Sequence, residues 1–564
     1  MKKLLIWVIA LLLLILLVFK GLPVLVNLYL NENADRIVSN MITRTSGFGD
    51  HEITFGEIKL DYNYSGTYLQ LEDIQITPAD NISENQLKVT LSAKQVRVSG
   101  FRWKDFLMEN SIVVDSATID NITIKTLSPA LDSMHFSESK PNRKAHRDYK
   151  IISVKHFGLN HLSVENRDSY SDSLRLELFD LSVAASGFRL TEEDIQNKEA
   201  LFDVDMIQGT ISKANLHFDE YRQMVIVDSL AFNTEDNTLG IGNFSLIHKL
   251  DRYTYTGLQD KRMSWIEIGD TKLKVRGMDF NSYFRNGTVE IDSLIASNLK
   301  LSVFTDKRKS EDLSKRPPMF HESLNKLEQV LHIKNTLLRN GYLRIEERAD
   351  NNAPQSGALF FTELNAHIKN ISNHKEMMAG NSQLVMNVKA KLMDIGPVDL
   401  SMDYDLASEN GTFKLKGTLG KMPLRTLNNM IEPEAKISLK SGVINRLDFN
   451  IIANDYEGSG EAIVRYEDLE LELLNKDFGK DQNVFRKIGS FLANKVVIKS
   501  NNPNKRGDLK KGTVYYLREP HKSIYNYWWK LIFSGLKSTL TGEDLEEMKK
   551  KELENRNGTP KKAK

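Results

Sequence analysis

The sequence predicts a mainly β protein that begins with a transmembrane helix and ends with an amphipathic helix. Three observations indicate this fold class. An uncharged apolar run opens the chain at Leu4–Phe19, polar and apolar residues alternate over most of the following sequence, and a segment that begins at Val96 recurs at Leu273. Because side chains of a strand alternate between its two faces, such alternation is typical of half-buried strands.

Composition limits the classes of function. The chain has 564 residues, which suggests about four domains at roughly 150 residues each. Hydrophobic residues make up 41% and charged residues 27%, as in ordinary folded proteins. A net charge of +1 provides no basic field that would favour nucleic acid as a partner. The absence of cysteine excludes disulfides and cysteine-ligated metals.

Residues 1–30 predict an uncleaved signal anchor. Two lysines precede the apolar run Leu4–Phe19, and apolar residues continue beyond Lys20. The alternative is a cleaved signal peptide, but no small-residue cleavage site follows the run. Its length reaches the ~20 residues that span the hydrocarbon of a bilayer. The two lysines predict a cytoplasmic N-terminus, and no second run of this length follows, so we expect a single-pass protein with its body outside the cytoplasm.

Changes of pattern divide the rest of the chain into segments. Residues 31–47 have helical spacing and predict a short juxtamembrane helix. Strand patterns fill residues 48–304 and 333–499, with a polar connector and a helix at 305–332 between them. Residues 500–564 hold an amphipathic helix and a charged tail. This pattern suggests roughly 35 to 40 strands.

The segment at Val96 aligns with the segment at Leu273 without a gap. Gly100 matches Gly277, and Asp115 matches Asp292. Each copy reads as a strand, a short helix, a strand, a polar connector and another strand. Internal repeats of this kind predict stacked units with a continuous core.

The clearest alternation runs through two segments that meet near Gly396 and Pro397, and it gives each segment one apolar face. Similar faces occur in the two repeat copies. The apolar-face residues that we select are Ile112, Val114, Val289, Ile291, Leu384, Met386, Val388, Leu392, Val398, Leu400, Met402 and Tyr404. In an ordinary sandwich these faces would contact another sheet.

The stretch from His521 to Leu540 predicts an amphipathic helix. Its apolar stripe and neighbouring cations are Ile524, Tyr527, Trp528, Trp529, Leu531, Ile532, Lys530 and Lys537. Aromatic residues beside lysines on one helix favour a membrane interface. A lid over an apolar cavity and a helix packed on the sheet are the alternatives, because exposed aromatic stripes are rare in soluble monomers.

The sequence contains no recognisable catalytic constellation. The motifs G-x-S-x-G, H-E-x-x-H and the phosphate-binding P-loop do not occur. We therefore expect no enzyme activity, no cofactor and no metal, and an exported enzyme remains a rival without a supporting motif.

Three stretches resemble the AsmA family, and the likeness is strongest to the AsmA-like inner-membrane proteins of Bacteroidetes. "ITFGEIKL", after the anchor and the juxtamembrane helix, is similar to the start of that family. "SGVINRLDFNIIANDYEGSGEAIVRYEDLELELL", Ser441–Leu474, resembles the family's C-terminal region, and "KSIYNYWWKLIFSGLKS" resembles its ending. The family is related to the TamB and YhdP proteins.

The resemblance implies a long antiparallel β-sheet curved into an open apolar groove, in which the twelve selected residues line the groove and contact acyl chains. It implies anchoring in the inner membrane, a periplasmic body, and a role in carrying phospholipid toward the outer membrane. Phospholipid is then the ligand, and a membrane or an outer-membrane partner protein contacts the C-terminal helix. The alternative is a structural or regulatory scaffold for outer-membrane assembly whose groove closes on itself.

Overall fold

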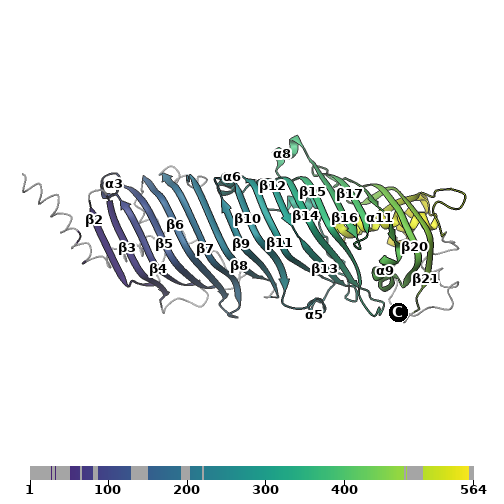
Figure 1. Cartoon of the computed structure of the whole chain (residues 1–564), viewed down its shortest axis with the longest axis horizontal. Coiled ribbons are helices and arrows are strands. Elements are labelled where there is room, and N and C mark those ends of the chain that lie inside the picture. The colour runs from purple at the N-terminus through teal and green to yellow at the C-terminus, as the bar shows by residue number, and fades with distance from the viewer. Residues whose placement is uncertain are drawn as a thin grey trace, which may run out of the picture. The chain divides into compact units, whose positions relative to one another are not determined.

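The computed structural model describes residues 27, 32, 51–63, 66–79, 87–128, 150–191, 203–218, 222–475, 478 and 500–557. Over these residues the predicted mainly β fold class is confirmed, because 22 strands belong to one large sheet with solenoid-like stacking (Figure 1). The chain divides into two compact units. Unit 1 is residues 1–243 with 284–286, and unit 2 is residues 244–283 with 287–564.

The predicted anchor and juxtamembrane helix lie outside the described residues, except for Asn27 and Glu32, which are both helical. Among the helices that the structure describes, none combines the length and the apolarity needed to cross a bilayer. The segment 484–493, which has a helical pattern, also lies outside the described residues.

The strands of unit 1 pair largely in chain order. They are β1 (His51–Thr54), β2 (Glu57–Asn63), β3 (Gly66–Pro78), β4 (Lys88–Phe101), β5 (Ser111–Ser128), β6 (Ile151–Asp168), β7 (Leu174–Thr191), β8 (Met206–Phe218) and β9 (Gln223–Asn233). α3 (Trp103–Met108) joins β4 to β5, and β10 (Thr238–His248) contains the boundary between the units.

In unit 2 two pairs of short strands each lie end to end along one long strand. β12 and β13 pair with β11, and β18 and β19 pair with β20. The strands are β11 (Ser264–Met278), β12 (Val289–Ser297), β13 (Lys300–Asp306), β14 (Leu331–Arg348), β15 (Gly357–Ser372), β16 (Gln383–Leu392), β17 (Gly396–Asp405), β18 (Phe413–Leu419), β19 (Met422–Pro423), β20 (Ile437–Ala453), β21 (Glu457–Leu473) and β22 (Gly512–Leu517).

The remaining described helices are short, apart from two at the C-terminal end. They are α5 (Arg252–Gly257), α6 (Phe280–Asn286), α7 (Phe320–Asn325), α8 (Lys375–Gly380), η2 (Leu424–Leu427), α9 (Asn428–Ala435), α11 (Ile524–Thr541) and α12 (Leu545–Asn557). The sequence pattern suggested a longer helix near Leu324, but α7 ends at Asn325 and Leu331 already begins β14.

The expectation of an antiparallel sheet is wrong at two places. β5 pairs with β6 in parallel, and β14 pairs in parallel with both β12 and β13. Hairpin neighbours such as β6–β7 and β16–β17 are antiparallel. Alternation is the same in both arrangements, so it carries no information about direction. The polar connectors are the relevant signal, because parallel neighbours need a long crossover between them.

Most long strands of unit 1 bend at one non-glycine residue of positive φ. These residues are Asp73, Asn121, His161, Asp180 and Ser229, with φ of 48°, 52°, 57°, 53° and 56°. We call each such bend a bulge. It changes the phase of the alternation, and β4, β5 and β6 keep their mutual register across it. Ile119 and Ile122 are therefore three residues apart in β5 but belong to one hydrophobic cluster.

The bulges explain why the estimate of roughly 35 to 40 strands is too high. A strand of eighteen residues such as β5 reads as two shorter strands, because its alternation changes phase at Asn121. The structure has 22 described strands instead.

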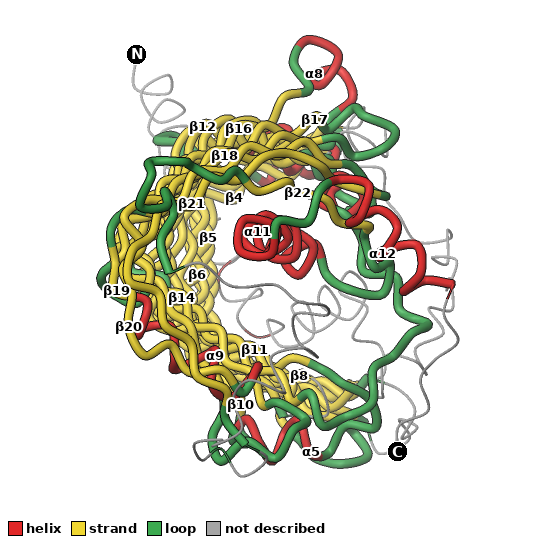
Figure 2. Tube along the Cα trace, turned by 90° about the vertical axis from the view of Figure 1, so that its right-hand side faces the viewer, coloured by secondary structure: helices red, strands yellow, loops and turns green. Residues whose placement is uncertain are grey.

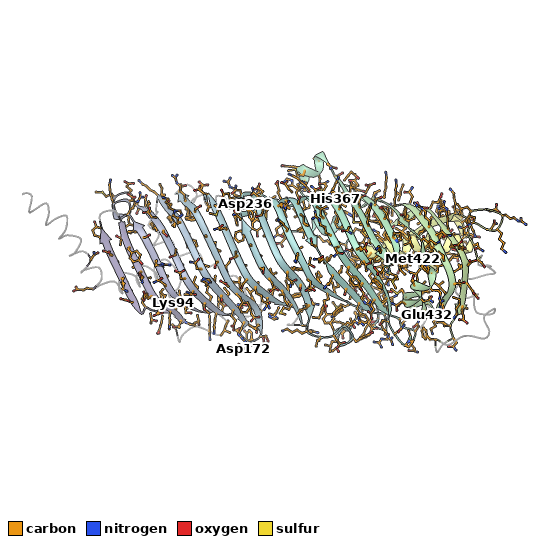
Figure 3. The ribbon with its side chains drawn as sticks, viewed as in Figure 1. Lys94, Asp172, Asp236, His367, Met422 and Glu432 are labelled. Carbon is orange, nitrogen blue, oxygen red and sulfur yellow. The ribbon has the colours of Figure 1, made fainter. Side chains whose placement is uncertain are left out.

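Connections at the two ends of the unit 1 strands contain Asp172 and Asp236 (Figure 3).

The hydrophobic core of unit 2 lies inside the curve of its sheet, where the strands surround α11 (Figure 2). Met402, Tyr404, Phe413, Ile451 and Leu531 are each 2% exposed or less. This core also includes residues of the connector between β13 and β14. The concave face of unit 2 is therefore filled by protein at its C-terminal end.

Candidate functional site

Four rows of apolar side chains cross the strands of unit 1. Each row consists of residues that are paired from strand to strand. The rows are Leu60–Leu69–Val98–Ala117–Phe157–Ala185–Ile207, then Ile58–Leu71–Val96–Ile119–Leu159–Val183, then Ile74–Ala93–Ile122–Leu162–Leu181–Ile211–Leu230, and finally Ile53–Ile76–Leu91–Ile124–Val164–Leu178–Ala214–Val227. We call these the apolar rows of unit 1.

The bulge residues keep these rows on one face. The bulges of β3, β5 and β6 lie between the second and third rows, and those of β7 and β9 lie between the third and fourth rows. Without the change of phase, the strand halves would turn opposite sets of side chains inward. Members of the rows pack together in one cluster, in which Leu71, Ile122 and Leu162 are at most 8% exposed and Ile119 and Leu159 are half-buried. The result is a continuous aliphatic surface.

Few described elements cover this surface. α3, the one helix of unit 1 whose bounds are described, lies at the strand ends between β4 and β5 (Figure 1). Among the described residues of unit 1, no other helix of known bounds is available to pack on the apolar rows. Sequence alternation alone indicated such a surface, but only the strand register shows that it is continuous.

Polar residues near the bulges of unit 1 form a network of hydrogen bonds and ion pairs. The Asn160 amide donates to Asp120 at 2.7 Å, Arg97 pairs with Asp120 at 2.8 Å, and His161 Nδ1 lies 2.8 Å from Asp180. The hydrogen bond from Asn160, with a smaller effect of Arg97, lowers the pKa of the Asp120 carboxyl despite its partial burial. These groups satisfy one another and provide no obvious catalytic pair.

The predicted groove residues of β16 and β17 meet across the two strands. Leu384 pairs with Tyr404, Met386 with Met402, and Val388 with Leu400. The turn between these strands contains Met393 and Asp394, both of positive φ, and not the Gly396–Pro397 pair that the sequence favoured.

These pairs belong to longer apolar rows in unit 2. The rows are Leu294–Thr336–Ile368–Met386–Met402–Leu415–Ile451, then Leu338–Ala366–Val388–Leu400–Gly417–Phe449–Ala462, and then Ala390–Val398–Leu419–Leu447–Val464. Leu392 pairs with Phe361 in a further row. The structure therefore places the eight predicted residues of β16 and β17 on one face.

That face is closed where α11 lies on it. Leu384, Met402 and Tyr404 are 3%, 2% and 0% exposed. The Tyr404 ring stacks on Phe413 with centroids 5.6 Å apart, and Phe413 meets Tyr527 of α11 edge to face at 6.2 Å. In this part of the molecule the predicted groove lining forms an ordinary packed core.

The other four predicted lining residues lie apart from these rows. Ile112 pairs with Ile152 and Val114 pairs with Val154, next to α3. In unit 2, Ile291 pairs with Ile333, and Val289 pairs with Leu331. Val114 is 7% and Ile291 is 8% exposed, but neither belongs to a hydrophobic cluster that contains the rows.

The C-terminal helix forms as expected, but five of the six apolar residues of its predicted stripe face the sheet, and Trp529 does not. Ile524, Tyr527 and Leu531 are 8%, 1% and 0% exposed, and Trp528 and Ile532 pack against the same core. The alternative of a helix packed on the sheet therefore describes α11. The helix cannot offer these five side chains to a membrane while they hold the core together.

A different stripe of α11 stays accessible. Tyr525, Trp529 and Phe533 are 71%, 49% and 38% exposed, and the rings of Trp529 and Phe533 stack with centroids 6.0 Å apart. Of the two predicted cations, Lys530 is half-buried and Lys537 pairs with Glu543 at 3.5 Å. Sequence analysis missed Tyr525 and Phe533, although their spacing of eight residues places them on the face of Trp529.

The connector Lys307–Lys326, which we call the strap, closes over the same core. Met319 is fully buried in the core, and Arg518 donates to the carbonyl of Pro317 at 2.8 Å. Glu311 forms an ion pair with Lys522, and His521 Nε2 lies 3.6 Å from Glu311. The strap thus ties the crossover before β14 to the segment that leads into α11.

His321 of the strap forms a small polar cluster with residues of the sheet. His321 Nδ1 is 2.8 Å from the Tyr404 hydroxyl, and His321 Nε2 is 3.7 Å from Asp455. Burial raises the pKa of Tyr404 and also that of Asp455, which His321 opposes. This cluster connects α7 to β17 and to the turn between β20 and β21, which is a packing role.

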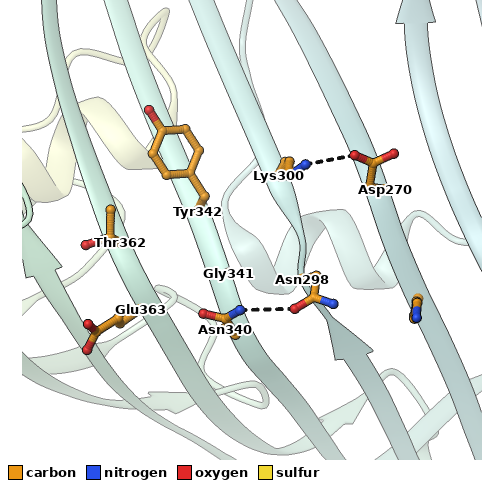
Figure 4. Close-up of a pocket in the computed structure, with 9 residues that line it drawn as sticks. Asp270, Asn298, Lys300, Asn340, Gly341, Tyr342, Thr362 and Glu363 are labelled. Atoms are coloured by element: carbon orange, nitrogen blue, oxygen red, sulfur yellow. Dashed lines mark hydrogen bonds and ion pairs between the residues drawn. The ribbon is translucent and has the colours of Figure 1, made fainter.

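A polar hollow of about 510 Å³ lies among β11, β13, β14 and β15 (Figure 4). Lys300 pairs with Asp270 at 2.8 Å across it, and the Asn340 amide donates to Asn298 at 3.1 Å. Asp270, Asn298 and Asn340 all have positive φ. The hollow is therefore a product of the strand bends, and its polar groups already bond to each other.

Among the described residues, no group of three or more histidine and carboxylate side chains is placed to hold a metal ion. No protein-family model matches the chain, and no curated protein matches it. The apolar rows therefore remain the principal candidate site, and their chemistry is that of an apolar surface.

Proposed function

We propose that this protein holds the acyl chains of membrane phospholipids on the apolar rows of unit 1 and carries them toward the outer membrane. The observation that carries the proposal is the continuity of the four rows, which pair residue by residue across the strands of unit 1. An acyl chain needs no hydrogen-bond partners, and a continuous aliphatic surface is sufficient for it.

The energetics favour such a ligand. Each methylene group that leaves water contributes about 0.8 kcal/mol, so even a partly covered chain gains several kcal/mol. A phospholipid headgroup would remain in solvent beside the strand ends, where charged and polar side chains are common. The surface offers no pattern of donors that would select one headgroup.

The N-terminal sequence supports a place in the inner membrane. The apolar run Leu4–Phe19 follows two lysines, which is the arrangement of an anchor with a cytoplasmic N-terminus. The likeness to AsmA-like proteins supports the same location and the same direction of lipid supply. The partners would be phospholipid, the inner membrane, and a membrane or partner protein at the C-terminal end.

A second candidate function is a scaffold for outer-membrane assembly that carries no lipid. The closed core of unit 2 favours it, because α11 and the strap occupy the face on which an acyl chain would lie. A sheet whose apolar rows are covered throughout would be a rigid spacer. The two candidates differ in whether lipid contacts the rows of unit 1.

Photocrosslinking distinguishes them. We would replace Ile119, a member of the apolar rows, with p-benzoylphenylalanine in the full chain, and Thr118 as the matched neighbour on the other face of β5. Illumination in cells followed by mass spectrometry should give phospholipid adducts at position 119 and few at position 118. Equal yields at the two positions, or none at position 119, would favour the scaffold.

A further inference from the structure

β22 is an edge strand whose outer side is closed by a helix. Among the described residues, β22 pairs with β21 alone, along Glu457–Ala462. On its other side the N–H of Thr513 donates to the Ser538 hydroxyl at 2.9 Å, and the N–H of Tyr515 donates to the Ser534 hydroxyl at 3.2 Å. The side chains of α11 thus take the place that a neighbouring strand would occupy.

Each of the two serine hydroxyls donates one hydrogen bond and accepts another in this arrangement. Ser534 donates to the carbonyl of Leu531 at 2.7 Å, and Ser538 donates to the carbonyl of Glu543 at 2.7 Å. Each hydroxyl therefore donates to a carbonyl of its own chain segment and accepts from the strand. The two residues are 7% and 2% exposed, so water does not compete for these bonds.

Small residues bring the helix close enough for these bonds to form. A β-carbon at Gly535 would lie 2.6 Å from Ala462 Cβ and 2.7 Å from Val514 Cγ2. A β-carbon at Gly512 would overlap the carbonyl oxygen of Gly535. Only glycine at both positions permits this approach, so the contact is specific to this helix and this strand.

A terminal strand of unit 1 also bonds a polar side chain of a helix. The side-chain amide of Asn27 donates to the carbonyl of Tyr62 at 3.3 Å, and the N–H of Tyr62 donates to the Asn27 oxygen. Asn27 is helical and Tyr62 lies in β2. A polar side chain from a helix therefore bonds the backbone of a terminal strand in each unit.

We infer that the outer edge of β22 is a strand-binding surface that α11 keeps occupied, and that the partner it excludes is β22 of a second copy of this chain. An unpaired edge is a template for another strand. β22, "GTVYYL", has no charge and is rich in β-branched and aromatic residues, so two copies suit an antiparallel, self-complementary pair. This inference is independent of the lipid function.

The test uses the full chain in mild detergent with Ser534→Ala and Ser538→Ala combined. Hydrogen exchange at the amides of Thr513 and Tyr515 should become at least tenfold faster, and sedimentation should show concentration-dependent dimers. The matched control is Thr541→Ala, because Thr541 bonds the Lys537 carbonyl within the same helix and does not reach β22. The control should exchange and sediment as the wild type does.

A second variant tests the inference by displacing α11 from β22 directly. Gly535→Leu should displace α11 by steric overlap, and a synthetic peptide copying residues 511–518 should bind this variant, block its dimerisation and leave the wild type unbound. The inference is wrong if Gly535→Leu stays folded and monomeric and takes no peptide. It is also wrong if the two amides exchange equally fast in the wild type and the serine variant.

Discussion

Leu531 of α11 lies over Gly458 of β21, so that a β-carbon at residue 458 would stand 2.5 Å from Leu531 Cδ2. The same β-carbon would be 2.7 Å from Ala453 Cβ on the neighbouring strand. Leu531 is fully buried and belongs to the core of unit 2. The absence of a side chain at Gly458 therefore lets Leu531 pack against the strand, and the size of residue 458 controls how closely α11 approaches the sheet.

We expect Gly458→Ala to lower the free energy of unfolding of unit 2 by about 1–3 kcal/mol, because the added methyl group has no space. Leu531→Ala should cost about 2–5 kcal/mol through the cavity that it leaves. The double variant should lose less than the sum, because truncation of Leu531 makes room for the alanine. Urea unfolding followed by tryptophan fluorescence measures all three. Gly380→Ala, where a β-carbon meets nothing within 4 Å, is the control. Strictly additive losses would show that the two residues do not interact.

Aspartate substitutions should distinguish the apolar rows of unit 1 from the closed core of unit 2. Met402→Asp buries an unpaired charge at a site that is 2% exposed, so we expect a loss of about 4 kcal/mol or more and local unfolding. Ile119→Asp, at a half-buried site, should cost about 1–2 kcal/mol and leave the fold intact while reducing bound lipid. Hydrogen exchange and lipid extraction measure these outcomes.

Lys389→Asp is the surface control for the aspartate pair, because the Lys389 side chain is 79% exposed and only loosely paired with Asp399 at 3.9 Å. It should cost less than about 1 kcal/mol and keep wild-type lipid. Folded Ile119→Asp protein with wild-type lipid content would contradict the proposed function, and a stable Met402→Asp protein would contradict the closed core.

Gly187 is predicted to resist substitution. Its φ is +69°, and a β-carbon there would overlap the carboxyl group of Asp205. We expect Gly187→Ala to lower the free energy of unfolding of unit 1 by about 1–2 kcal/mol more than Gly240→Ala, because Gly240 has open space around its Cα and no positive φ. Circular dichroism during urea unfolding provides the comparison. Equal effects of the two substitutions would mean that this contact imposes no strain.

The hairpin between β6 and β7 should lose stability in acid. The N–H of Ser171, together with Tyr170 and Arg175 and against the effect of burial, lowers the pKa of Asp168 to about 2. The pKa of an aspartate in the unfolded chain is about 3.9. The contribution of the Asp168 charge to the free energy of unfolding is therefore complete above that pH and disappears as the pH falls toward 2. The difference in free energy of unfolding between wild type and Asp168→Asn should be constant at neutral pH and shrink below about pH 4. A difference that does not change with pH would disprove this role of the charge.

The sequence carried enough information to predict the class of fold and the recurrence of one local pattern. Gly100 aligns with Gly277 and Asp115 aligns with Asp292 in the two repeat copies, and the structure shows each glycine at positive φ against the aspartate of its own copy. Gly187 against Asp205 is a third instance that sequence analysis missed. The interval from Gly187 to Asp205 is three residues longer than the interval from Gly100 to Asp115, so the gapless alignment did not extend to it.

The site was harder to predict than the fold, and the reasons are physical. The bulge at Asn121 hides the continuity of β5 by reversing its alternation, so a single apolar face reads as two. The stripe of α11 had the composition of an interface helix, but its burial depends on Gly458 and Gly512, which lie on other elements and leave no mark on the helix sequence. Which face of an amphipathic helix is free is a tertiary property.

The strands of each unit are synthesised in nearly the order in which they pair. During synthesis the newest strand therefore always presents backbone groups without a neighbour, and each hairpin closes the edge of the one before. The parallel joints of β6 and β14 must wait for a connector of the chain to be made first. α11 follows β22 in the sequence, so the edge of β22 is closed only after residues 524–541 have been made. A polypeptide truncated before Ile524 would keep that edge without its helix, and an uncovered strand edge favours aggregation.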